Sequence, residues 1–168
     1  WFFLRRWRFG HGPAALGGMT YAFSAYLALR LNHTNVIQIL AHVPWLLACI
    51  DMAIRLPSRR GRLGAGAAVA ALTASQLLLG YPPSVWYSGL AELAYAVVIG
   101  WGRRSYPRIS SEELPDRRWT AQAKDLAGSL LHLGLAKLLG VLLAAVQVLP
   151  TLGAISLSPR RVQSREAL

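Results

Sequence analysis

Two charged residues, Glu92 and Lys137, stand inside long apolar stretches of the chain. An isolated charge in hydrocarbon costs several kcal/mol, so both side chains are expected to face the inside of a helical bundle or a wet cavity. At ~1.5 Å of rise per residue, their depths differ by roughly 8 Å, a distance that a lysine side chain can span. They form either a structural ion pair between two helices, which we favour, or the wall of a functional cavity.

Polar residues between the apolar stretches supply further candidate binding groups. His33 and Asn35 lie in a short polar loop, and Tyr81 lies in a turn between two apolar runs. Ser158, Arg160 and Arg161 follow the last apolar run. A guanidinium group donates two parallel hydrogen bonds to a phosphate, so these arginines with Ser158 are interpreted as an anion site for a lipid-linked phosphate. The alternative is contact with anionic headgroups alone, or a polar tail without a role.

No complete metal, nucleotide-binding or hydrolase motif is present. The histidines lie in separate segments, at His11, His33, His42 and His132. The sequence therefore predicts no metal site, identifies no cofactor and does not support a bound divalent cation. The net charge of +11 comes from arginines placed between apolar runs, without a nucleic-acid-binding pattern, so no nucleic-acid partner is expected.

The composition predicts a membrane protein. Hydrophobic residues make up 54% of the chain and its mean hydropathy is +0.37, too apolar for a typical soluble domain. A bilayer span needs about 20 mostly apolar residues. The sequence thus predicts an all-α, polytopic transmembrane bundle, a single domain over 1–168, interpreted as a fragment of a longer protein. Five spans are expected, at 13–31, 36–56, 63–80, 85–101 and 126–149, with prolines 82 and 83 reversing the chain.

The arginine distribution orients these spans. The segments 1–8, 57–62 and 102–124 are basic, whereas the loops 32–35 and 81–84 carry no Lys or Arg. Positive charge favours the cytoplasmic side, so the basic segments are placed in the cytoplasm and the two short loops outside. The tail after Pro150 then also lies outside, although it is basic. The expected location is the plasma membrane, with the lipid bilayer as the first partner.

Local spacing predicts two further contacts. Asp51 and Arg55 are four positions apart on one expected helix and should form an ion pair near the water. Small residues recur at helical spacing in two spans and predict close helix packing: Gly66, Ala70 and Ala74 in one, Ala136, Gly140 and Ala144 in the other.

The order of several motifs resembles the YfhO family, bacterial polytopic membrane proteins related to GT-C glycosyltransferases. These motifs are Met19-Thr20-Tyr21-Ala22-Phe23-Ser24-Ala25-Tyr26, His33, Pro44-Trp45-Leu46-Leu47, Leu79-Gly80-Tyr81-Pro82-Pro83, Ala145-Val146-Gln147-Val148-Leu149-Pro150-Thr151-Leu152 and Ser158-Pro159-Arg160-Arg161. The resemblance covers most of the chain as an interior segment. It implies a GT-C-like fold and transfer of a sugar from a polyprenyl-phosphate donor to a cell-envelope acceptor at the outer membrane face.

The chain departs from this family where Gly80-Tyr81-Pro82-Pro83 replaces the usual Gly-His-Pro-Gln. The acidic residue expected to act as the base in GT-C enzymes would precede Trp1, so the resemblance leaves the catalytic residue of this chain unassigned. Two other classes remain: a transporter or flippase of a lipid-linked substrate, using Glu92 and Lys137, and a non-catalytic membrane scaffold.

Overall fold

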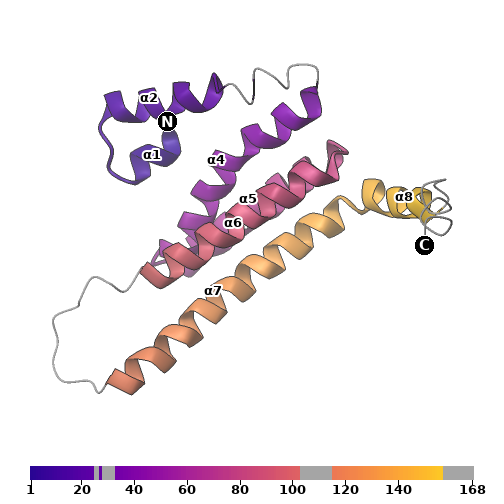
Figure 1. The fold of residues 1–168 in the computed structure, drawn as a ribbon. Helices are drawn as coiled ribbons and strands as arrows, with labels where there is room; N and C mark the ends of the chain where they lie inside the picture. Colours follow the sequence, from indigo (N-terminus) through magenta and orange to yellow (C-terminus); the bar gives the residue numbers. More distant parts are fainter. Residues whose placement is uncertain (25–26, 28–32, 103–114, 157–168) are drawn as a thin grey trace, which may run out of the picture.

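The computed structural model describes residues 1–24, 27, 33–102 and 115–156, and this part of the chain is all-α (Figure 1). Its seven helices are α1 (Phe2–Arg6), α2 (His11–Ala22), α4 (Thr34–Arg55), α5 (Arg59–Leu78), α6 (Pro82–Gly102), α7 (Pro115–Leu143) and α8 (Ala145–Ser156). The all-α part of the predicted fold class is therefore confirmed.

Four helices, α4 to α7, form an antiparallel bundle. α5 packs mainly against α4 and α7. α6 packs against the same two helices and makes few contacts with α5. α4 and α6 therefore start at one end of the bundle, where α5 and α7 finish (Figure 1). The short helix α1 packs against α4 and α2 packs against α1, and α8 follows α7.

The core of the bundle is built from small and branched apolar side chains. Leu46, Ile50 and Ile54 of α4 are almost completely buried, as is Val69 of α5. The small-residue faces of α5 and α7 meet, because a Cβ atom built on Gly140 would stand 2.7 Å from the carbonyl oxygen of Ala70. The close packing predicted from these faces is confirmed at this contact.

Gly80, and not the proline pair, forms the turn between α5 and α6. Its φ angle is +71°, in the left-handed region that glycine adopts without a Cβ clash. Pro82 and Pro83 instead begin α6. At the start of a helix the missing N–H costs no hydrogen bond, so the expectation that the prolines reverse the chain was wrong.

Two helices are long and apolar enough to cross a membrane, judged by length and composition: Thr34–Arg55 and the Ala123–Leu143 part of α7. α5 and α6 cover the other two central expected spans, 63–80 and 85–101, but do not reach the same apolarity within the described residues. Three arginines in the first turns of α5, and polar groups along α6, account for this difference.

The expected outer spans have different bounds in the structure. α2, His11–Ala22, covers only residues 13–22 of the span expected at 13–31, and most of the following residues lie outside the described ranges. The span expected at 126–149 is interrupted at Ala144, whose N–H is shared between the carbonyls of Gly140 and Val141 in a tightened last turn. Pro150 therefore lies inside α8 and does not end the helix.

The basic segment expected at 102–124 is helical from Pro115 onward, because α7 begins there. α7 is 29 residues long and so extends from the polar segment into the apolar one. Residues 103–114 lie outside the described ranges.

Candidate functional site

A hydrogen-bonded chain of polar side chains crosses the interior of the bundle. The Gln76 side-chain amide of α5 donates to the carbonyl of Ile39 in α4 at 3.1 Å and to the Ser88 hydroxyl of α6 at 3.2 Å. Ser88 donates in turn to Glu92 Oε1 at 2.7 Å. Glu92 then pairs with the ammonium group of Lys137 on α7. This polar chain, from Ile39 to Lys137, connects all four helices of the bundle.

The ion pair between Glu92 and Lys137 joins a buried group to a partly open one. The Glu92 side chain is 2% exposed and the Lys137 side chain 30%. A buried carboxylate needs a cation and hydrogen bonds to offset its desolvation, and Lys137 and Ser88 supply them. The pairing expected from the depths of the two residues is therefore present.

The same ion pair lines a cavity of about 150 Å³ in the middle of the bundle. Its remaining wall is apolar and comes from all four helices, including Ile50, Val69 and Leu133. Glu92 and Lys137 therefore match both expected roles: they form an ion pair between two helices, and they line a cavity.

Apart from Glu92 Oε2, which pairs with Lys137, two buried polar atoms next to this region have no hydrogen-bond partner within the described residues. They are the side-chain carbonyl oxygen of Gln76 and the hydroxyl of Thr73. Buried polar atoms in native structures are nearly always paired with protein or with ordered water. Gln76 is fully buried, so its side-chain carbonyl oxygen is an unpaired hydrogen-bond acceptor inside the bundle, beside Ser88.

The loop residues predicted to bind a ligand gather at one end of the bundle. His33 is the N-cap residue of α4, and Asn35 is exposed in its first turn. Tyr81 is half-buried just before α6. The antiparallel order brings both loops to the end where α7 passes into α8, and Gly80 lies near the Gln147 side chain of α8. Glu92 and Lys137 lie deeper, on the inner turns of their helices.

The predicted anion site of Ser158, Arg160 and Arg161 lies outside the described residues. Its assignment to a phosphate stays a prediction.

A second polar cluster ties the N-terminal helix to the opposite half of the bundle. Arg6 of α1 donates to Asp51 Oδ2 from Nε at 3.0 Å and from Nη2 at 2.6 Å. Arg55 pairs with Asp51 Oδ1 at 2.9 Å, which confirms the ion pair predicted from their spacing. Tyr95 donates to the same oxygen at 3.5 Å and accepts from the Trp7 indole at 3.2 Å. Asp51, 3% exposed, is therefore fully partnered.

Three residues of these polar clusters were not predicted from the sequence: Gln76, Ser88 and Arg6. Ser88 and Glu92 are four positions apart and so share one helix face, a signal that was present in the sequence. Gln76 is a polar residue inside an apolar run, where it is costly unless it has partners. Arg6 carried no comparable signal, because 45 positions separate it from Asp51.

Among the described residues, no group of three or more His, Cys, Asp or Glu side chains converges to hold a metal ion. Two of the histidines have other partners. His42 lies 2.6 Å from the Gln38 carbonyl and 2.9 Å from the Ser75 hydroxyl, and His132 lies 3.2 Å from the Arg62 carbonyl.

Comparisons of the chain with protein-family models, with curated proteins and with solved structures find no match.

Proposed function

We propose that the chain is a membrane-embedded part of a GT-C-like glycosyltransferase in the bacterial plasma membrane. It would transfer a sugar from a polyprenyl-phosphate donor to a cell-envelope acceptor at the outer face. One observation carries this proposal: three polar residues, His33, Asn35 and Tyr81, lie at the same end of the bundle. The arginines at the start of α5 lie at the opposite end. The type of reaction proposed, sugar transfer, is the one implied by the resemblance of the motif order to the YfhO family.

The exposure of α7 supports placement in a bilayer. Within Ala123–Leu143, only 17% of the 18-residue apolar window is buried, whereas the core helix of a soluble protein would be mostly buried. Leucines such as Leu131, Leu135 and Leu142 are 57–65% exposed. An apolar surface of this kind favours contact with lipid or with further helices. In the proposed polytopic arrangement, α5 and α6 would be the neighbouring spans.

The gathered loop residues have the chemistry to hold a sugar. The imidazole of His33, the amide of Asn35 and the hydroxyl of Tyr81 together offer donors and acceptors for hydroxyl groups. Ser158, Arg160 and Arg161 would hold the donor phosphate, as the sequence predicts. No described residue is assigned as the catalytic base.

A transporter of a lipid-linked substrate is the second candidate, and the central cavity is the observation that favours it. Glu92 and Lys137 line that cavity, as coupling charges in a transporter would. Its volume of about 150 Å³ is below the ~300–1,000 Å³ of most small-molecule pockets. The bundle would have to open before a sugar could enter, so we rank this function second.

Donor binding by the purified chain in lipid nanodiscs tests the proposal, with radiolabelled undecaprenyl-phosphate glucose as the probe. Tyr81→Phe and His33→Ala should each weaken binding about fivefold, the cost of roughly one hydrogen bond. Their matched controls, Tyr87→Phe on the exposed side of α6 and His11→Ala in α2, should bind as the unchanged chain does.

The other two functions predict different results. Equal binding by all four variants, or no binding above undecaprenol, would contradict the transferase and support a scaffold. Uptake of a lipid-linked sugar into proteoliposomes that is lost in Glu92→Gln would identify a transporter.

A further inference from the structure

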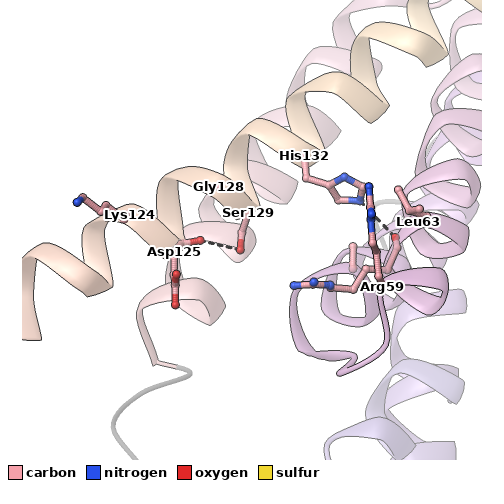
Figure 2. A pocket seen from close by; sticks show the side chains of 9 residues that line it. Arg59, Leu63, Lys124, Asp125, Gly128, Ser129 and His132 are labelled. Atoms are coloured by element: carbon pink, nitrogen blue, oxygen red, sulfur yellow. Dashed lines mark hydrogen bonds between the residues drawn. The ribbon is translucent and has the colours of Figure 1, made fainter.

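A basic cavity lies between the start of α5 and the stretch 124–132 of α7 (Figure 2). It has a volume of about 510 Å³, more than three times that of the cavity beside Glu92. The residues that line it are Ala53, Arg59, Arg62, Leu63, Lys124, Asp125, Gly128, Ser129 and His132. No residue of the proposed sugar site belongs to this basic cavity.

The charges around the basic cavity favour an anion. Arg59, Arg62 and Lys124 bring three cations against one acid, Asp125. In Figure 2 Arg59 extends into the space between the two helices, whereas the Lys124 side chain extends from α7 away from that space. The N-terminal end of α5 adds the positive end of a 20-residue helix dipole at the same place.

The walls of the basic cavity are attached to the bundle. His132 of α7 contacts the Arg62 carbonyl of α5 at 3.2 Å, and its ring fills the space above Gly66. The Ser129 hydroxyl donates to the Asp125 carbonyl at 2.9 Å. The His132 contact thus holds the start of α5 against the middle of α7 beside the cavity, and the arginines start from a fixed backbone.

Apolar surface leads away from the cations. Leu63 lines the basic cavity and is 53% exposed. Gly128 and Leu131 share one face of α7, since they are three positions apart, and Leu131 is 65% exposed. The candidate membrane-spanning part of α7, Ala123–Leu143, includes the Lys124–His132 stretch that lines the basic cavity. The basic cavity therefore lies where the polar and apolar parts of the bundle surface meet.

We infer that the basic cavity binds the phosphate of an anionic phospholipid headgroup in the cytoplasmic leaflet. The arginines hold the phosphate, and an acyl chain continues along Leu63 and Leu131. Basic pockets between membrane helices on this side suit such headgroups, and an arginine fork fits phosphate oxygens better than a lysine does. This inference depends on the membrane placement in the proposed function, but not on sugar transfer.

The experiment is native mass spectrometry of the purified chain in detergent with dioctanoyl-phosphatidylglycerol. Saturable binding is expected, at least tenfold tighter than that of dioctanoyl-phosphatidylcholine. Arg59→Gln with Arg62→Gln should weaken it about tenfold or more, and Arg62→Lys, which keeps the charge but removes the fork, should also weaken it. Arg60→Gln is the matched control, because Arg60 is exposed on the same turn and does not line the cavity.

Several results would overturn the inference. Equal binding of the two lipids would remove headgroup selectivity, and an equal loss in Arg60→Gln would show that only net charge matters. Inorganic phosphate that binds as tightly as the lipid, and competes with it, would identify a free-phosphate site instead. Circular dichroism of each variant checks that it is folded. Because no sugar donor is present, failure here together with intact donor binding would reject this inference alone.

Discussion

The Tyr21 hydroxyl donates a hydrogen bond of 2.7 Å to the carbonyl of Leu40. Leu40 is four positions before Pro44, and Pro44 lies inside α4 without an N–H to offer. Tyr21 of α2 thus satisfies the one carbonyl that the proline leaves unpaired. This contact explains how α4 continues through Pro44 and why α2 lies against it.

Tyr21→Phe should therefore lower the free energy of unfolding by about 1 kcal/mol, because it removes one hydrogen bond and leaves the Leu40 carbonyl unpaired. In a Pro44→Ala background the new N–H at position 44 can pair with that carbonyl, so the same change should cost much less. Unfolding in mixed micelles of the four proteins measures both losses. Equal losses in the two backgrounds would show that the proline and the tyrosine are not coupled.

Arg6 should matter more than its neighbours for attachment of α1. It makes two hydrogen bonds to the buried Asp51, whereas Arg8 is exposed. Arg6→Gln should destabilise the protein by about 1.5–3 kcal/mol, the range for hydrogen bonds to charged groups. Arg8→Gln changes the net charge equally and should have little effect in the same unfolding measurement. Similar losses would indicate a general charge effect.

The polar chain through the bundle predicts non-additive losses. Glu92→Gln and Lys137→Met each leave the other group buried or partly buried without its partner, so each should destabilise the protein. The double variant should recover about 1–3 kcal/mol of the summed loss. Lys137→Met combined with Arg60→Gln serves as the control pair and should be additive. Additivity in both pairs would contradict an energetic contact between Glu92 and Lys137.

Local spacing predicted some of these contacts and not others. Asp51 and Arg55 share a helix face, so their positions in the sequence were sufficient. Glu92 and Lys137 belong to different helices, but each is a charge in an apolar run. Opposite charges at similar depth are expected to pair, because pairing lowers the cost of burying each one. Both pairs could be predicted because helical spacing and the cost of a charge in an apolar segment can be read from the sequence alone.

Contacts that depend on how the helices pack were not predictable in this way. Helical spacing predicts which face of α5 carries Gln76. It does not predict that this face packs against Ser88 of α6. Likewise, the direction of α1 after folding decides that Arg6 reaches Asp51. The turn at Gly80 was misassigned because a proline pair and a left-handed glycine both favour a break, and only the backbone angles distinguish them.

The contact between α5 and α7 predicts opposite effects for two glycines of α7. A Cβ atom at Gly140 would stand 2.7 Å from the Ala70 carbonyl oxygen and 2.8 Å from Thr73 Cβ, so the helices would have to move apart. Gly140→Ala should destabilise the protein by about 1–3 kcal/mol. Gly134 has no atom within 4 Å of its Cβ position, so Gly134→Ala should cause no loss. Melting temperatures in detergent compare the two, and an equal loss would argue against tight packing at Gly140.

The proposed membrane placement also predicts which residues face each side of the bilayer. Thr34 and Pro83 are exposed at one end, and Arg60 is exposed at the other, beside arginines 59 and 62. Since clustered arginines favour the cytoplasm, single cysteines at positions 34 and 83 should react in whole cells with a membrane-impermeant maleimide. A cysteine at position 60 should react only after the cells are permeabilised.

The native Cys49 is 7% exposed and is replaced by alanine in this experiment, so that each variant carries one thiol. Labelling after denaturation confirms that all three variants are present in equal amounts. Outside labelling at 60 but not at 34 and 83 would invert the topology and move His33, Asn35 and Tyr81 to the cytoplasm. The proposed outward sugar site would then be lost, whereas donor binding at that end of the bundle would still be measurable. Equal labelling of all three positions in intact cells would contradict a membrane-spanning bundle.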